Sequence, residues 1–191
     1  MSKLGPLNEY EPISDWTPYV RDYKISLVTG EVEIKINKKA LSDLDKVLKF
    51  IKDTFPNDVI TGSLALNLYG LIDRDIKDID ILIEDTDRYK GYYISSLYGY
   101  DSRDNYNNRL GYKKFKHRYG FWNSIFPKEY LVDFFENKKL SDVFTFEYDN
   151  HTYSLEHPID IIEHKININD RKSYWDLYQI FIQNNYEVSE V

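Results

Sequence analysis

The sequence predicts an α+β fold, because segments with the period of a helix and segments with the period of a strand both occur along the chain. From Lys38 to Phe55, apolar residues recur every three or four positions, the spacing of an amphipathic helix. Isoleucines alternate with aspartates at the start of Asp78–Ile83, which is the period of two of a strand. Near the C-terminal end, Pro158 suits the first position of one helix and Asp170 the N-cap of another.

Composition limits the classes of protein to which the chain could belong. The 191 residues include 32 acids and 25 bases, so the net charge of −7 argues against a surface that binds nucleic acid or anionic membrane all over, although a local basic patch is possible. The absence of cysteine excludes disulfides, thiolate zinc sites and a cysteine nucleophile. Since no apolar run approaches the roughly 20 residues of a membrane span, we expect a soluble, cytoplasmic protein with no membrane partner.

The N-terminal third is expected to hold an extension followed by a helix. Residues 1–37 are punctuated by proline and predict an extension laid on the core, with a short half-exposed strand at Glu31–Ile36. The helix from Lys38 should end at Pro56, since proline stops helices. Val59–Thr61 then reads as a short buried strand.

The middle of the chain begins with a turn and a second strand. Gly62-Ser63 predicts a turn, with a helix over Leu64–Tyr69 capped by Ser63. A charged loop at residues 73–77 then leads into the strand Asp78–Ile83. Residues 89–120 are rich in tyrosine and asparagine, and only a loosely defined helix is expected there, at residues 89–97.

The last third predicts strands followed by two helices. Residues 121–135 contain two strand-like stretches separated by Pro127, and the second of them covers residues 130–135. Residues 144–148 and 152–155 flank Asp149-Asn150-His151 and predict a hairpin. Helices follow at about residues 158–166 and 170–184. We expect a core at 38–137, with the hairpin and helices of 138–191 packed on it as one domain overall.

Asp78 and Asp80 are the aspartate pair with the strongest chemical significance. Pairs with the same spacing occur elsewhere, but only these two aspartates lie in strand alternation, where residues two apart share a face. Two carboxylates on one face repel each other unless a cation or a proton intervenes. The pair therefore either binds a metal ion or marks the solvated end of a strand.

Two neighbouring features favour the metal-binding interpretation. Gly62-Ser63 lies between a strand and a helix, where free backbone N–H groups favour a phosphate, although an ordinary capped turn would have the same sequence. Asp133 interrupts an apolar strand, and a buried charge is costly unless it is paired or bound to metal. Three carboxylates that face a phosphate cradle suit two-metal phosphoryl transfer.

This ordered set resembles the nucleotidyltransferase superfamily, whose fold is the mixed β-sheet core of polymerase β with flanking helices. The resemblance extends from about Leu41 to Glu136. It implies that Gly62 and Ser63 hold the triphosphate, that Asp78 and Asp80 bind Mg²⁺ or Mn²⁺, and that Asp133 completes the catalytic and metal-binding set. It also implies transfer of a nucleoside monophosphate from an NTP to an acceptor hydroxyl.

The C-terminal helices resemble the tail of AbiEii-type nucleotidyltransferases, which are toxins of phage-defence and toxin–antitoxin systems. The resemblance lies in His157–Lys165 and in the segment from Arg171 to Ile180. It implies that Lys165, Arg171 and Asp176 bind nucleotide, and that an antitoxin or other partner protein exists. The alternative is a plain amphipathic helix pair whose charged residues form its solvated side.

Several functional alternatives stay open at this point. The basic, aromatic stretch at residues 112–119 could follow an RNA backbone, or it could be an exposed strand with its lysines outward. The acceptor could be RNA or tRNA, a protein hydroxyl or a small molecule. A second hypothesis is a catalytically silent nucleotidyltransferase-like module with a binding or structural role, for example in a phage particle.

Overall fold

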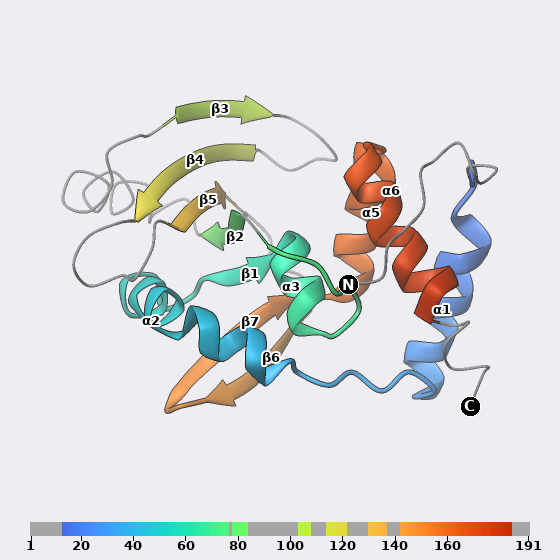
Figure 1. Ribbon diagram of the computed structural model, residues 1–191, viewed down its shortest axis with the longest axis horizontal. Coiled ribbons are helices and arrows are strands. Elements are labelled where there is room, and N and C mark those ends of the chain that lie inside the picture. Colours follow the sequence, from blue (N-terminus) through green and yellow to red (C-terminus); the bar gives the residue numbers. More distant parts are fainter. Residues whose placement is uncertain are drawn as a thin grey trace. The chain divides into compact units, whose positions relative to one another are not determined.

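The structure is a computed structural model that describes residues 13–76, 78–83, 103–107, 114–121, 130–136 and 142–184. It confirms the predicted α+β class, with a mixed sheet and flanking helices (Figure 1). The described residues form two compact units. One, which we name the helical unit, takes its residues from 1–37, 66–74 and 158–191; the other, the sheet unit, takes them from 38–65 and 75–157.

Within the described residues, seven strands of the sheet unit form one sheet in the order β3-β4-β5-β2-β1-β7-β6. Their bounds are β1 Val59–Thr61, β2 Asp78–Ile83, β3 Arg103–Asn107, β4 Lys114–Phe121, β5 Tyr130–Glu136, β6 Val143–Tyr148 and β7 His151–Glu156. The sheet is mixed, since β1 runs parallel to β7 and β2 runs parallel to β5, while the other neighbours are antiparallel.

The sheet is most buried at its central strands. Ile60 on β1, Ile79 and Ile81 on β2, and Val132 on β5 are all buried, as their apolar sequences predicted. The predicted helix over Lys38–Phe55 is confirmed as α2, Lys38–Thr54, which ends before Pro56. Its apolar stripe is buried and it packs on β7, so α2 covers part of the sheet.

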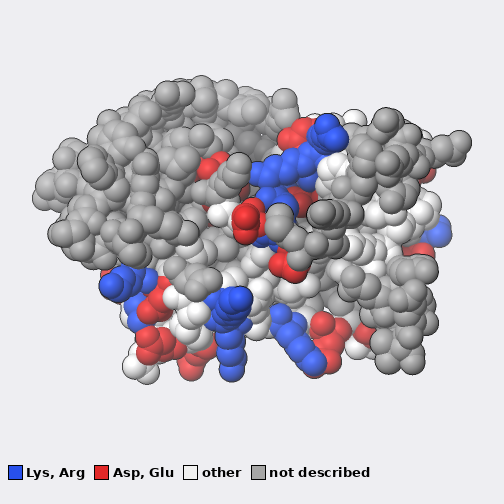
Figure 2. All heavy atoms as spheres, viewed as in Figure 1, with Lys and Arg blue, Asp and Glu red and all other residues white. Residues whose placement is uncertain are grey.

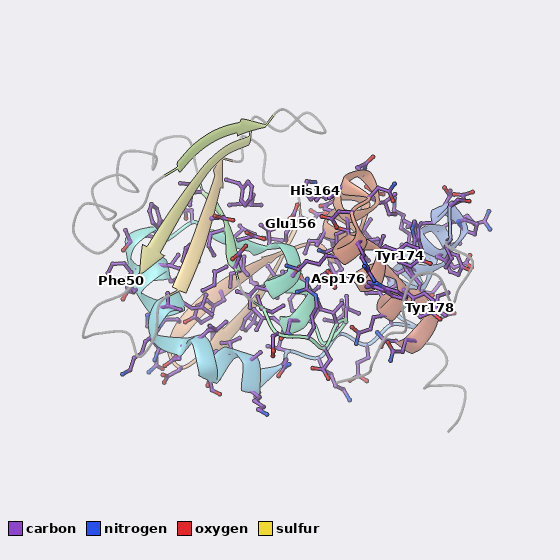
Figure 3. The ribbon with its side chains drawn as sticks, turned by 45° about the horizontal axis from the view of Figure 1, so that its top comes forward. Phe50, Glu156, His164, Tyr174, Asp176 and Tyr178 are labelled. Carbon is purple, nitrogen blue, oxygen red and sulfur yellow. The ribbon has the colours of Figure 1, made fainter. Side chains whose placement is uncertain are left out.

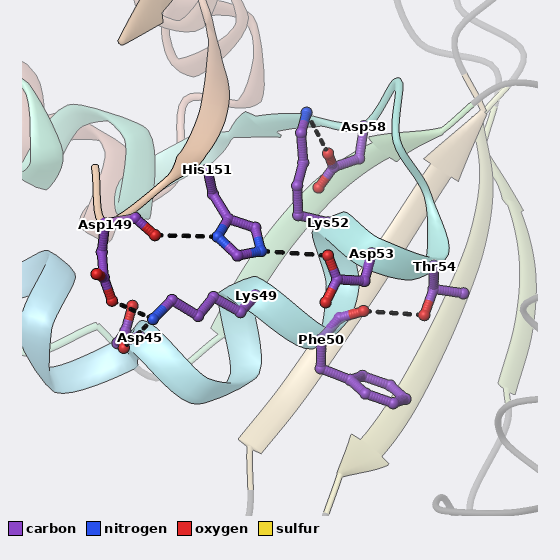
Figure 4. Close-up of polar contacts among 9 residues, drawn as sticks. All are labelled: Asp45, Lys49, Phe50, Lys52, Asp53, Thr54, Asp58, Asp149 and His151. Atoms are coloured by element: carbon purple, nitrogen blue, oxygen red, sulfur yellow. Dashed lines mark hydrogen bonds and ion pairs between the residues drawn. The ribbon is translucent and has the colours of Figure 1, made fainter. Parts of the chain in front are cut away.

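The predicted hairpin is confirmed as β6 and β7, and ionic contacts fasten it to α2 (Figure 4). Asp149 and Asn150 have φ angles of 46° and 64°, the positive values that a tight two-residue hairpin turn requires. Lys49 on α2 binds the carboxylates of both Asp45 and Asp149, and a ring nitrogen of His151 lies 3.2 Å from an oxygen of Asp53. These contacts hold the turn of the hairpin against α2.

The helical unit contains α1 Thr17–Thr29, α5 Pro158–Ile168 and α6 Arg171–Tyr178, and α6 continues as the π-helix η3, Gln179–Gln183. The predicted N-cap of α6 is confirmed, because the Asp170 side chain accepts a hydrogen bond of 2.7 Å from the backbone N–H of Ser173. An aromatic cluster forms much of the core of this unit. The centroid of the Trp16 ring lies 5.5 Å from that of the Tyr174 ring and 6.0 Å from that of the Phe181 ring.

Three expectations about local structure were wrong. The extension expected at residues 1–37 contains helix α1, which was not predicted because its apolar residues lack a clear helical period and it buries little beyond Val20. Residues 31–36 form no strand, since the short period-two pattern finds no neighbouring strand to pair with among the described residues. Helix α3 spans Gly62–Leu68 and so begins at Gly62, two residues earlier than predicted, which makes Ser63 its second residue.

The remaining expectations concern undescribed segments, the basic stretch and membrane spans. The helix expected at residues 89–97 and the segment around Pro127 lie outside the described residues. Of the basic stretch at residues 112–119, residues 114–119 lie on strand β4, and residues 112 and 113 lie outside the described residues. On the face shown in Figure 2, the basic and acidic side chains of the described residues are interspersed. No helix in the described part of the chain is long and apolar enough to cross a membrane.

Candidate active site

The pairing of β1, β2 and β5 brings two of the predicted catalytic aspartates together. Asp80 on β2 pairs with Thr61 on β1 and with Asp133 on β5. Because paired residues project from the same face of a sheet, Thr61, Asp80 and Asp133 form a row across three adjacent strands. Asp78 lies two residues before Asp80 and therefore projects from the same face. The three predicted carboxylates thus share one face of the sheet.

These carboxylates differ in their burial. Asp133 is only 1% exposed, whereas Asp78 and Asp80 are half-buried. The opposite face of β2 is formed by Ile79 and Ile81, which are 3% and 0% exposed and fix the strand in the core. Adjacent strands lie about 4.8 Å apart, so Asp80 and Asp133 are near neighbours. Asp80 and Asp133 thus form a position with two adjacent carboxylates inside the sheet unit.

Gly62 lies in direct contact with this position. It is the first residue of α3 and has a φ of +66°, in the left-handed region that favours glycine. A Cβ atom added to Gly62 would lie 2.4 Å from the Oδ2 atom of Asp80, far closer than two such atoms can approach. A glycine is therefore required, both for the sharp exit from β1 and for the closeness of the chain to Asp80. Ser63 follows at the start of α3 and is half-buried.

The donor set suits Mg²⁺ or Mn²⁺, because these hard cations prefer carboxylate oxygens. Among the described residues, no group of three or more acidic or histidine side chains is arranged so that it could hold a metal ion by itself. Magnesium commonly uses one or two carboxylates and takes its other ligands from water and substrate phosphates. The juxtaposed Asp80 and Asp133 fit that pattern.

Sequence reasoning missed two residues in the same region. The Oγ1 atom of Thr61 donates a hydrogen bond to the carboxylate of Glu156, the last residue of β7. Glu156 lies 95 positions away in the sequence, and no motif linked the two residues. Only the parallel pairing of β1 with β7 brings them together.

In the helical unit, two of the three residues predicted to bind nucleotide are brought together around one carboxylate. Asp176 on α6, labelled in Figure 3, is buried. It accepts hydrogen bonds from Nε and Nη2 of Arg74, at 2.7 and 2.9 Å. The Nζ atom of Lys165 lies 3.0 Å from the Oδ2 atom of Asp176. Arg171 is exposed and is not a member of this group.

Electrostatics explains how the Asp176 carboxylate is kept ionised. Burial alone would raise its pKa, but the hydrogen bonds and charges of Arg74 and Lys165 outweigh burial and lower the pKa below its ordinary value. Arg74 was missed by sequence reasoning because it lies in a loop. Asn67 and Gln179 hold that loop through hydrogen bonds to the backbone of Arg74 and Asp73, at 3.4 and 3.2 Å.

Similarity to known proteins is found among solved structures. No family model matches the sequence, and no curated protein matches it. One similar solved structure is that of a cytoplasmic RNA terminal U-transferase, with 18% identity, a TM-score of 0.36, and coverage of 64% of this chain and 37% of that chain. Another is that of JHP933 from Helicobacter pylori, with 17% identity, a TM-score of 0.38, and coverage of 69% of this chain and 57% of that chain. This chain spans less than two thirds of the length of either protein.

Proposed function

We propose that this protein is a nucleotidyltransferase that uses Mg²⁺ or Mn²⁺ to transfer a nucleoside monophosphate from an NTP to an acceptor hydroxyl. The observation that carries the proposal is the position of Asp80, which pairs with Asp133 on one side and touches Gly62 of the strand-to-helix turn on the other. Carboxylates for a cation and backbone N–H groups for a phosphate are thus supplied at one place. Their combination is what phosphoryl transfer requires.

Each residue has a distinct part in the proposed reaction. Gly62 and Ser63 hold the β- and γ-phosphates, and Asp78, Asp80 and Asp133 supply the carboxylates that would hold the divalent cation. Asp133 also helps to accept the proton of the attacking hydroxyl. A bound cation neutralises the developing charge on the phosphates. The acceptor oxygen forms a bond to the α-phosphorus, the bond from that phosphorus to the bridging oxygen breaks, and pyrophosphate leaves.

The role of Lys165, Arg171 and Asp176 in nucleotide binding is a separate proposal. It rests on the resemblance of the C-terminal helices to AbiEii-type toxins, as does the idea of an antitoxin partner. The contacts of Lys165 and Arg74 with the Asp176 carboxylate support a structural role equally well. Arg171→Ala separates the two roles, because Arg171 is exposed and its loss should weaken NTP binding without lowering the stability of the fold.

The proposed function is tested by label transfer. Purified protein is incubated with each α-labelled NTP, Mg²⁺, and total RNA, cell protein or a small-molecule extract, and the label is followed into each fraction. We expect label to appear with the wild-type protein and to vanish with Asp80→Asn, which keeps the size of the side chain but removes its charge. Asp73→Asn is the matched control, because Asp73 is exposed in the loop before β2.

Nucleotide binding supplies a second readout. A ligand present at 100 times its dissociation constant stabilises a protein by about 2.7 kcal/mol, which corresponds to roughly 5–10 °C for a chain of this size. A magnesium-dependent thermal shift without transfer would mean that the site binds NTP and that the acceptor was missing. Neither shift nor transfer with any NTP would contradict the proposal and favour a silent binding module.

A further inference from the structure

The contact between Thr61 and Glu156 lies on the same sheet face as the proposed site. Thr61 is the residue directly before Gly62, and it pairs with Asp80 on the neighbouring strand. Its hydroxyl donates to the Glu156 carboxylate at the end of β7, and Glu156 is labelled in Figure 3. The row of side chains across the sheet therefore runs from Glu156 through Thr61 to Asp80 and Asp133.

Glu156 lies far from the carboxylates proposed to bind the cation. Its strand, β7, lies two strands away from β2, and neighbouring strands are about 4.8 Å apart, so roughly 10 Å separates the backbones of Glu156 and Asp80. The ligands of Mg²⁺ lie only about 2.1 Å from the ion. The Glu156 carboxylate accepts the hydrogen bond of the Thr61 hydroxyl, so Thr61 links Glu156 to the site.

The backbone pairing between β1 and β7 is short. The pairing of β1 with β7 has Ile60 and Leu155 as its register pair, and β1 itself has only three residues. The hydrogen bond from the Thr61 side chain to Glu156 extends the contact between β1 and β7 by one residue, up to the start of the Gly62-Ser63 turn. A charge-assisted hydrogen bond is about twice as strong as a neutral one, so it restrains this exit effectively.

We infer that Glu156 is a positioning residue, which acts through Thr61 to hold the Gly62-Ser63 turn in place against Asp80. Its importance for nucleotide binding rests on the proposed function, whereas its effect on the turn does not. Loss of the bond should let the turn move while leaving Asp80 and Asp133 paired, since their pairing depends on β2 and β5. The expected defect is thus in nucleotide affinity more than in the rate of the chemical step.

The first experiment measures the turn directly by ¹⁵N relaxation in NMR, which gives a backbone order parameter for each residue. Thr61→Val removes the donor and should lower the order parameters of residues 62–64 from about 0.85, the value of a rigid backbone, to below about 0.6, while that of Ile81 in the neighbouring strand stays unchanged. Thr61→Ser keeps the hydroxyl and should restore the wild-type order parameters. Unchanged order parameters in Thr61→Val, with a fold of normal stability, would overturn the inference whether or not the protein is an enzyme.

The second experiment uses pairs of variants and a nucleotide. Thr61→Val should raise the dissociation constant for Mg-NTP about tenfold, and Glu156→Ala by at least as much. The double variant should lose less binding free energy than the two single losses add up to, because both changes remove the same bond. In steady-state transfer, KM should rise while kcat changes little, and Thr61→Ser should resemble the wild type. Additive losses in the double variant would contradict the proposed path from Glu156 through Thr61.

The two experiments separate two kinds of failure. Lower order parameters at residues 62–64 in Thr61→Val, combined with no Mg-NTP binding by the wild-type protein, would support the positioning role and refute the proposed function. Normal Mg-NTP binding by Thr61→Val would refute the positioning role and leave the proposed function intact. Urea denaturation of each variant checks that a loss of global stability does not account for either result.

Discussion

The contact between Gly62 and Asp80 gives the most direct test of the candidate site, through Gly62→Ala. Gly62 has a φ of +66°, and an alanine in the left-handed region costs about 1–2 kcal/mol. The added methyl group would also lie 2.4 Å from Asp80 Oδ2, and an ordinary contact of about 3.4 Å requires a shift of about 1 Å. Crowding of this kind typically costs a further 1–3 kcal/mol. We therefore expect a total loss of roughly 2–5 kcal/mol.

Gly30→Ala is the matched control for the backbone contribution. Gly30 has a φ of +76°, and an added Cβ atom would meet nothing within 4 Å. Its substitution should therefore cost only the backbone strain, about 1–2 kcal/mol. Urea denaturation followed by circular dichroism measures both variants, and the difference between them reports the collision with Asp80.

A double-mutant cycle identifies the partner in that collision. Asp80→Ala removes the Oδ2 and Cγ atoms and leaves only Cβ, at 3.3 Å from the added methyl group. The double variant Gly62→Ala/Asp80→Ala should be more stable than the sum of the single losses predicts, by roughly 1–3 kcal/mol. Additive losses, or a Gly62→Ala variant as stable as Gly30→Ala, would refute the claim that the turn packs on this carboxylate.

Two further predictions concern buried charges. Asp176→Asn should destabilise the protein by about 3 kcal/mol in urea denaturation, because it leaves Arg74 and Lys165 without their shared carboxylate. Asp22→Asn, on the exposed side of α1, is the control and should change the stability little. Equal effects of the two substitutions would contradict a structural role for the contacts of Asp176 with Arg74 and Lys165. Burial raises the pKa of Asp58 to about 6 despite the charge of Lys52, 3.0 Å away. Because the pKa in the folded state is higher than in the unfolded state, the contribution of Asp58 to stability is fully present below about pH 4 and is lost as the pH rises through 6. The wild-type protein should therefore lose stability relative to Asp58→Asn by roughly 3 kcal/mol between pH 4 and pH 7, and parallel pH profiles of the two urea midpoints would show that this pKa is not raised.

The elements that sequence predicted best are those with a strong local period. Helix α2 and strand β2 were both found within a residue or two, since an amphipathic stripe or a strict alternation needs little help from the rest of the fold. Helix α1 was missed because few of its residues are buried, and its stability comes from contacts at Trp16 and Val20 instead of from a stripe. For such a helix the tertiary environment, and not the local period, decides the conformation.

The residues of the candidate site also divide into those that a local sequence pattern predicts and those that only tertiary contacts reveal. The alternation of β2 placed Asp78 and Asp80 on one face, and the glycine before a helix marked the turn, so these residues could be chosen from sequence. Arg74 and Glu156 could not, because a loop arginine and a glutamate at the end of a strand are common. Their partners, Asp176 and Thr61, lie 102 and 95 positions away in the sequence.

The sequence by itself determined the local conformations and the chemical character of the residues: an acidic strand, a glycine turn, a hairpin and two C-terminal helices. These depend on interactions between residues close in the chain, which a periodic pattern reveals. The tertiary structure alone decided that Asp80 pairs with Asp133, that Gly62 touches Asp80, and that Thr61 meets Glu156. Such contacts follow from strand order and register, which arise from the packing of the whole sheet and leave no mark in the spacing of any one segment.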